Sequence, residues 1–183
     1  MNVSTIYSIG HGNKKIENFI RELKVFEISY LIDIRSKPYS KWNPAFNKAE
    51  LEKSLKENNI SYVFLGDQLG GLPSDASCYD SEGKVVYDLI KEKEFFKEGL
   101  IRLTRANEKK VKLAVMCSES KPGECHRSKL VGQELLKSGI SINHIISQNQ
   151  VKSQETVMTE LTKGLGTVDL FGNVKEFVSR KSY

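Results

Sequence analysis

Short apolar runs alternate with amphipathic stretches along the chain, and this alternation predicts a regular order of strands and helices. The run SYLIDI over residues 29–34 is almost entirely apolar, as expected for a strand that is covered on both faces. In the stretch 15–26 the apolar side chains recur at helical spacing and form one face. On these criteria we predict strands at 4–10, 29–34, 60–65, 111–116 and 140–146, helices at 15–26, 48–59, 92–108, 125–139 and 153–164, and a loop at 66–84.

The order of these elements indicates the fold class. Strands that alternate with helices are typical of a parallel sheet with helices on both of its faces. We therefore expect a three-layer α/β domain over residues 1–163, with a five-stranded, mainly parallel sheet, and a C-terminal extension over 164–183.

Composition and charge limit the setting of the protein. The 183 residues are 39% apolar and 28% charged, and the net charge of +5 comes from acids and bases that interleave along the chain. No apolar run approaches the roughly 20 residues of a membrane span, and the start has no export-signal pattern. Three cysteines are an odd count without disulfide spacing, which favours a reducing compartment. We expect a cytosolic protein with no membrane partner.

Unusual polar residues follow four of the predicted strands. Ligands of open α/β sheets bind outside the carboxyl ends of the strands, so we expect these residues to surround one crevice. They are Gly10, His11, Gly12 and Asn13 after the first strand, Asp33, Arg35, Ser36 and Pro38 at the second, Asp67, Gln68, Gly70 and Gly71 after the third, and Cys117, Glu119, Cys125, His126 and Arg127 after the fourth.

Cys117 stands where the fourth predicted strand ends, in the stretch AVMCSESKPGECHRSKL. Two interpretations fit this position. A buried cysteine can close a strand as a small hydrophobe, or a thiolate near a helix N-terminus can be a nucleophile with a lowered pKa. His126, at the start of the next helix, is either an acid or base at the crevice rim or an ordinary surface residue.

Arg127 lies four residues before Val131 and eight before Leu135, so it shares the helical stripe that faces the sheet. A guanidinium directed inward from a first turn needs an anionic or polar partner. We expect Arg127 to point into the crevice and bind the ligand, with an internal carboxylate of Glu119 or Asp33 as the alternative partner.

A metal site is a further candidate, because Cys117, Cys125, His126 and His11 can all bind metals. Structural zinc sites usually carry pairs of cysteines separated by two to four residues. Seven residues separate Cys117 from Cys125. On spacing alone we expect neither a metal nor another cofactor.

Five motifs occur in this order: IGHG (9–12), DIRSKP (33–38), FN (46–47), LGG (69–71) and MCSESKPGECHR (116–127). Together they resemble the bacterial domain-of-unknown-function family 488 over residues 5–146, which implies no settled activity. More distantly the frame resembles rhodaneses, with a similar Asp-x-Arg after an early strand and a cysteine at a strand end. That resemblance implies a rhodanese-like or flavodoxin-like arrangement. The loop departs from rhodaneses in its length and in Glu119 and Glu124, whose carboxylates would repel a persulfide or phosphate.

The acids and amides fit another chemistry. Donors and acceptors of these kinds can recognise a nucleobase or nucleoside, and a carboxylate can be nucleophile or base in glycosidic-bond cleavage. For Asp33 and Arg35 an internal ion pair is an equally good interpretation. We predict the catalytic residues Asp33, Glu119, Cys117 and His126, and the binding residues His11, Asn13, Arg35, Gln68, Cys125 and Arg127.

Two other stretches bear on partners. SKWNPAFN (40–47) places Trp42, Asn43 and Phe46 beside lysines, where the rings either stack on bases or pack over the crevice. TVDLF (167–171) resembles the tail motif with which bacterial replication and repair proteins dock on the sliding clamp, and it otherwise packs onto its own domain. The residues of this tail motif are Thr167, Val168, Asp169, Leu170 and Phe171.

The sequence therefore predicts a cytosolic enzyme, a hydrolase or transferase, that acts on a nucleotide-like or nucleic-acid substrate. Two alternatives stay open: a rhodanese-like thiol enzyme that uses Cys117, and a non-catalytic nucleic-acid-binding or adaptor protein.

Overall fold

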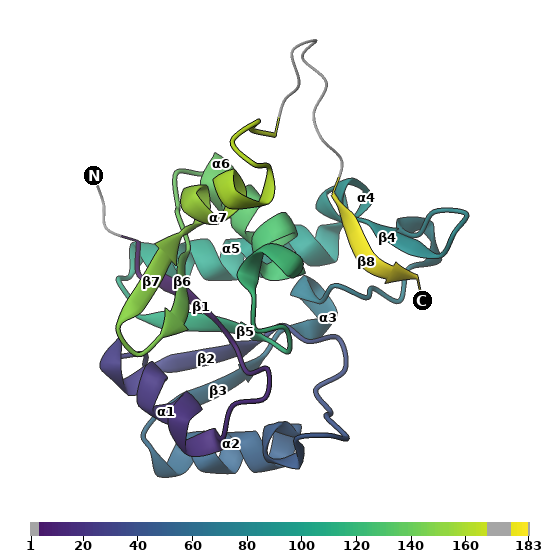
Figure 1. The fold of residues 1–183 in the computed structure, drawn as a ribbon. Helices are drawn as coiled ribbons and strands as arrows, with labels where there is room; N and C mark the ends of the chain where they lie inside the picture. The colour runs from purple at the N-terminus through teal and green to yellow at the C-terminus, as the bar shows by residue number, and fades with distance from the viewer. Residues whose placement is uncertain (1–3, 168–176, 183) are drawn as a thin grey trace.

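A six-stranded sheet forms the centre of the protein, in the order β3-β2-β5-β1-β6-β7 (Figure 1). The computed structural model describes residues 4–167 and 177–182. The first five strands in this order run parallel, and β7 pairs antiparallel with β6. The strands are β1 (Ile6–Gly10), β2 (Tyr30–Asp33), β3 (Ser61–Phe64), β5 (Leu113–Cys117), β6 (Asn143–Ser147) and β7 (Gln150–Ser153).

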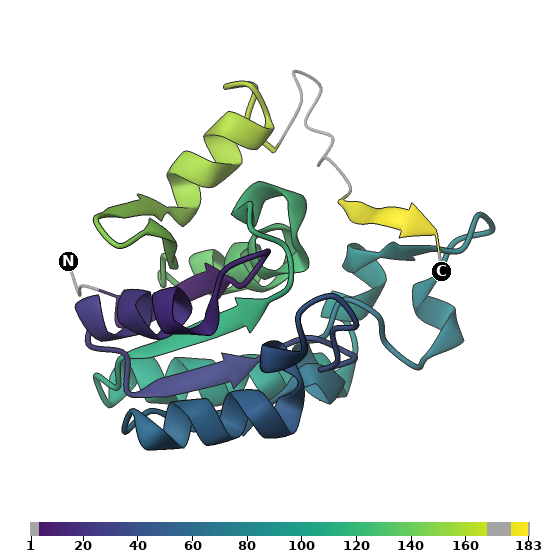
Figure 2. The same ribbon diagram turned by 60° about the horizontal axis from the view of Figure 1, so that its bottom comes forward.

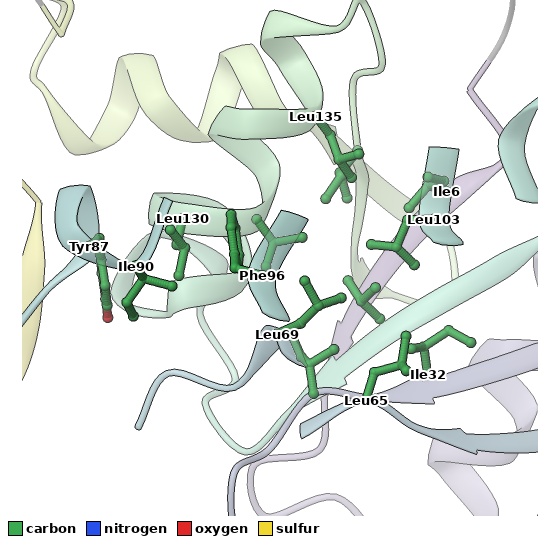
Figure 3. Packing of buried hydrophobic residues seen from close by; sticks show 14 of the residues in the cluster. Ile6, Ile32, Leu65, Leu69, Tyr87, Ile90, Phe96, Leu103, Leu130 and Leu135 are labelled. Carbon is green, nitrogen blue, oxygen red and sulfur yellow. The ribbon is translucent and has the colours of Figure 1, made fainter. Parts of the chain in front are cut away.

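Helices cover both faces of this sheet. The side chains of successive strand residues point to opposite faces, so one strand contributes to two hydrophobic clusters. In β5, Leu113 and Val115 belong to the cluster shown in Figure 3, whereas Ala114 and Met116 belong to the cluster on the opposite face. The helices are α1 (Ile16–Val25), α2 (Lys48–Glu57), α3 (Gly66–Leu69), α4 (Tyr87–Lys91), α5 (Glu94–Glu108), α6 (Gln133–Lys137) and α7 (Gln154–Leu161).

The helices dock through apolar stripes at helical spacing. In α1, Phe19, Ile20 and Leu23 are buried in the same cluster as Leu51 and Leu55 of α2. On the other face, α5 contributes Phe96 and Leu103, which pack with buried residues of the sheet and of residues 130–135 (Figure 3). Residues 15–26 and 92–108 thus form helices because their apolar positions recur every three or four residues.

A second, two-stranded sheet lies beside the main domain. It consists of β4 (Lys84–Val86) and β8 (Val178–Ser182), which pair antiparallel and lie next to α4 in both views (Figures 1 and 2). Phe177 is buried in the core cluster of α5, so the end of the predicted extension 164–183 packs on its own domain. Of the predicted clamp motif only Thr167 belongs to the described residues, and positions 168–171 lie outside them.

The five predicted strands and five predicted helices are all present, with ends shifted by at most three residues. The five-strand prediction was wrong by one strand, because β7 adds an antiparallel edge. The predicted loop 66–84 contains α3 and a 3-10 turn, η2 (Ala76–Cys78). The predicted helix 125–139 begins with η4 (Arg127–Gly132), a π-helix, and such turns often occur at functional sites. Within the described residues no helix is both long and apolar enough to cross a membrane.

Candidate functional site

A cavity of about 230 Å³ lies at the carboxyl edge of the sheet, where the loops after β1, β2 and β5 meet. Strand β8 and helix α4 contribute to the same cavity although they come from distant parts of the chain. Tyr87 of α4 and Ser179 of β8 thus face the loops of the main sheet, and nothing in the sequence pattern predicted either of them. The lining residues are His11, Arg35, Ser36, Lys37, Tyr39, Ser40, Gly71, Leu72, Tyr87, Cys117, Ser118, Glu119, Glu124, His126 and Ser179.

Cys117, Glu119 and His126 meet at one side of this cavity. The thiol of Cys117 donates to Oε2 of Glu119 over 2.9 Å, and its Sγ lies 3.8 Å from Nδ1 of His126. Cys125 Sγ lies 3.7 Å from the same Nδ1, although Cys125 itself does not line the cavity. Three of the four predicted catalytic residues are therefore neighbours.

A main-chain contact at Nε2, on the side of the ring away from the two thiols, fixes the orientation of His126. Its Nε2 lies 3.2 Å from the carbonyl oxygen of Ile34. Because a carbonyl oxygen only accepts hydrogen bonds, Nε2 must carry a proton, and Nδ1 then faces the two thiols. Gly71 makes room for the ring, since a Cβ at this position would lie 2.8 Å from Nδ1.

Cys117 and Glu119 differ in charge, because their pKa values are shifted in opposite directions. The hydrogen bond to Cys125 and burial raise the pKa of Cys117 well above 9, so its thiol stays neutral and donates to Glu119. Burial opposes ionisation of Glu119, but the bond from Cys117 and the charge of His126 outweigh it and lower the pKa to about 2. A lowered thiol pKa, which the nucleophile interpretation of Cys117 requires, is therefore absent from this arrangement.

Asp33 and Arg35 form a buried ion pair at the end of β2. Nη2 of Arg35 donates to Oδ2 of Asp33 over 2.6 Å, and Nε donates to Oδ1 over 2.9 Å. Tyr62 donates its hydroxyl to the same carboxylate over 2.8 Å. Asp33 is fully buried and does not line the cavity, whereas Arg35 does. The carboxylate thus serves to hold Arg35 in the cavity wall, which is the internal-pair interpretation.

His11 also lines the cavity and is stacked on Phe46, with 4.4 Å between the ring centroids. Its Nδ1 donates to the carbonyl oxygen of Gly12 over 2.9 Å, which leaves Nε2 as the acceptor. That Nε2 is buried and has no partner among the described residues. Burial lowers the pKa of His11, and the charge of Arg35 lowers it further. A neutral acceptor therefore faces the cavity.

Arg127 is placed differently from the sequence prediction. The side chain is buried, as its helical stripe indicated, but it lies beneath the loop after β5 and is not part of the cavity wall. Its Nη2 donates to the carbonyl oxygens of Glu119 and Ser120, each over 2.9 Å. Its hydrogen-bond partners among the described residues are main-chain carbonyls, and these bonds hold the backbone that carries Glu119.

Asn13 and Gln68 lie outside the cavity. Asn13 is exposed in the turn after β1. Gln68 points to α5, where it donates to Glu98 over 3.3 Å and accepts from Arg102 over 3.2 Å. Both residues follow a strand, as predicted. The short helix α3 directs Gln68 away from the cavity, and the turn at Gly12 does the same for Asn13.

The loop between β2 and α2 forms the rim of the cavity. Trp42 is 89% exposed and Tyr39 is 69% exposed, and the ammonium of Lys41 lies 5.7 Å from the Trp42 ring centroid. Phe46, in contrast, is fully buried against His11 and Phe19. The two interpretations of this segment thus divide between its residues, because Phe46 packs inward while Trp42 faces solvent.

One group of side chains in the described residues could hold a metal ion. The ligand atoms of Cys117, Cys125 and His126 all lie within 4.8 Å of one another, and all three residues are buried.

Comparison with known proteins places the chain in a family. The model of the family described as "Domain of unknown function DUF488" matches residues 15–133, which include α1, the ion pair, the rim loop and the Cys117–Arg127 loop. The match does not bear on a rhodanese relationship. No curated protein and no solved structure matches the chain significantly. A match over this share of the sequence shows that the chain belongs to the DUF488 family.

Proposed function

We propose that the protein is an enzyme that binds single-stranded nucleic acid at the rim loop, residues 36–43, and acts on one nucleotide unit in the adjoining cavity. The observation that carries the proposal is the exposed pair Tyr39 and Trp42 on a lysine-bearing loop that itself lines the cavity. Exposed apolar groups that lie together and are rimmed by polar residues often mark an interaction site. Bases stack on such rings, and lysines beside them bind the phosphates.

The composition of the cavity supports a small polar substrate. Arg35 and Lys37 provide positive charge, and Ser36, Ser40 and Ser118 provide hydroxyl groups. Pockets for drug-sized ligands measure roughly 300–1,000 Å³. A cavity of about 230 Å³ therefore suits a single reacting unit and not an extended ligand.

Glu119 is the best placed carboxylate to act as a nucleophile or base, because its low pKa keeps it ionised. It lines the cavity beside Cys117, and Arg127 fixes its main chain from the opposite side. Glu124 also lines the cavity but is exposed to solvent, and Asp33 is paired with Arg35. Hydrolysis or transfer at a glycosidic bond needs such a carboxylate, and a neutral acceptor at His11 could orient the substrate.

Trp42 is the single tryptophan of the chain, so its fluorescence reports directly on the rim. Single-stranded oligonucleotides should quench it on titration, whereas inorganic polyphosphate should bind the lysines without quenching. Trp42→Phe retains a ring, and Trp42→Ala removes it. Because stacking contributes roughly 1–3 kcal/mol per base, Trp42→Ala should weaken binding in an anisotropy assay by about 5–150-fold.

Lys41→Ala should reduce the dependence of log affinity on log salt by about 0.7. Tyr30→Ala, which removes a partly exposed aromatic residue at the amino end of β2, is the matched control and should bind normally. Turnover of a bound oligonucleotide should be lost in Glu119→Gln with binding retained. Equal effects of Tyr30→Ala and Trp42→Ala, or absence of quenching, would refute the proposal.

A further inference from the structure

We infer that Cys117, Cys125 and His126 form a binding site for a divalent metal ion of the zinc class at the edge of the cavity. Their ligand atoms lie within 4.8 Å of one another, with both sulfur atoms 3.7–3.8 Å from Nδ1 of His126. A tetrahedral ion with Zn–S bonds of about 2.3 Å and Zn–N bonds of about 2.0–2.1 Å places ligand atoms roughly 3.5–3.8 Å apart. The two sulfur–nitrogen distances thus match those of a tetrahedral site, and the two sulfur atoms lie within 4.8 Å of each other.

The contact behind His126 is the one that a metal-binding histidine needs. A ligating imidazole usually donates its other N–H to a carboxylate or main-chain carbonyl, which fixes the ring and its tautomer. Here Nε2 lies 3.2 Å from the carbonyl oxygen of Ile34, and Nδ1 is left for the ion. The contact holds the ring with Nδ1 directed at both sulfur atoms, which is the orientation that a metal bound between them requires.

The second cysteine accepts a main-chain hydrogen bond. Cys125 is buried, and the backbone N–H of Arg127 donates to its Sγ over 3.5 Å. The seven residues between Cys117 and Cys125 argued against a metal site. This separation in sequence does not show how the loop folds. The 3-10 turn η3 (Pro122–Glu124) folds the chain back, so that the end of β5 and the start of η4 bring two distant cysteines together.

The chemical types of the three ligands, and their number, indicate which metal binds and what kind of site it forms. Two thiolates and an imidazole suit zinc better than magnesium or calcium, which prefer oxygen. Structural zinc sites have four protein ligands, whereas catalytic sites have three and an open position. Cys117 and His126 line the cavity and Cys125 does not, so the open position faces the cavity. Glu119 is the carboxylate next to this position, with its Oε2 2.9 Å from Sγ of Cys117.

Metal binding by these three side chains does not depend on nucleic-acid binding. The two can fail separately, because metal binding is measured without any oligonucleotide. If the protein binds metal but oligonucleotides do not quench Trp42, the metal site stands and the proposed substrate is refuted.

The experiment is a titration of reduced, chelator-treated protein with Co²⁺. The expected result is about one bound ion per chain, with the strong near-ultraviolet charge-transfer absorption of cobalt–thiolate bonds and the visible bands of tetrahedral Co²⁺, both removed by added Zn²⁺. Cys117→Ser, Cys125→Ser and His126→Gln should each weaken binding by more than the roughly 10–100-fold that loss of an outer partner causes. Cys78→Ala, at a buried cysteine of η2 that neither lines the cavity nor belongs to the group of three ligands, should bind normally.

Circular dichroism of each variant separates loss of metal from loss of fold. Because a buried-site variant can unfold, the wild-type protein supplies a second measurement. Its Zn²⁺ content after dialysis should be about one ion per chain, and blocking of its thiols should release that ion. Folded wild-type protein without thiolate charge transfer in excess Co²⁺, or a Cys78→Ala variant as impaired as Cys117→Ser, would overturn the inference.

Discussion

Arg127 is joined to Glu119 through the main chain, because its Nη2 donates to the carbonyl oxygen of Glu119 over 2.9 Å. A second bond from the same nitrogen reaches Ser120, also over 2.9 Å. The carboxylate of Glu119 is thereby free to face the cavity while its backbone is held from below. Gly10 takes part in this arrangement, since a Cβ there would lie 1.9 Å from the carbonyl oxygen of Glu119.

Substitution of Arg127 should therefore affect stability first. Arg127→Ala leaves two carbonyls without their charged donor, and bonds to charged groups contribute roughly 1.5–3 kcal/mol each. We expect the free energy of unfolding to fall by about 3 kcal/mol in urea denaturation. Arg102→Ala, on the exposed side of α5, should change it little. If Arg127→Lys were as stable as the wild type but unable to bind oligonucleotide, Arg127 would instead contact the ligand.

The strands and helices could be predicted because their signal is local. The apolar run 29–34 and the stripe of α1 each depend on neighbours in sequence. The edge strand β7 has the sequence QVKS and little apolar character, so its pairing with β6 depends on the turn between them. The same holds for β4 and β8, which lie more than ninety residues apart in the chain.

The candidate site was predictable only in outline. Placement at strand ends predicted that His11, Glu119 and His126 would meet, because parallel strands end at one edge. It could not show that Asp33 faces Tyr62 and not the cavity, since that depends on which way one side chain turns. Nor could spacing show that the η3 turn brings Cys125 to Cys117.

Asp33→Asn should destabilise the protein because it leaves Arg35 charged, buried and without its carboxylate. Breaking a buried pair on one side costs roughly 3–5 kcal/mol. We expect a loss of this size in equilibrium unfolding, with the hydroxyl of Tyr62 also losing its charged acceptor. Asp75→Asn, which removes a surface pair with Lys93, is the control and should leave stability almost unchanged. A stable Asp33→Asn protein without activity would restore Asp33 as a catalytic residue.

Gly71→Ala tests the placement of His126 without altering any ionisable group. The new Cβ would lie 2.8 Å from Nδ1 and 2.9 Å from Cγ of the ring, so the ring must move. Crowding of this kind costs about 1–3 kcal/mol of stability. We expect a folded variant whose Co²⁺ affinity, measured by titration, falls by at least about tenfold. Gly123→Ala meets only Val157 at 3.7 Å and should bind as the wild type does. Equal affinities in the two variants would show that the ring is not constrained as described.

His144 should make the fold sensitive to acid. It is fully buried, its Nδ1 lies 2.6 Å from Oγ of Ser8, and its Nε2 lies 2.8 Å from Oε1 of Gln154. Burial lowers the pKa of His144 to about 4, although the bond to Gln154 opposes the shift. The unfolded chain takes up this proton near pH 6.5. Between these values only the unfolded state is protonated, so stability is full above pH 6.5 and falls as the pH is lowered.

From pH 7 to pH 5 this one group should remove about 2 kcal/mol from the free energy of unfolding. Urea denaturation at pH 5, 6 and 7 measures the loss. His144→Gln keeps a polar side chain that can bond to Ser8 or Gln154 but cannot titrate, so its stability should depend less on pH by that amount, whatever its stability at pH 7. The comparison of slopes removes the contribution of His11, whose pKa is also lowered and which is present in both proteins. An unchanged slope in His144→Gln would assign the acid sensitivity to other groups, because the buried imidazole would then already be protonated in the folded state.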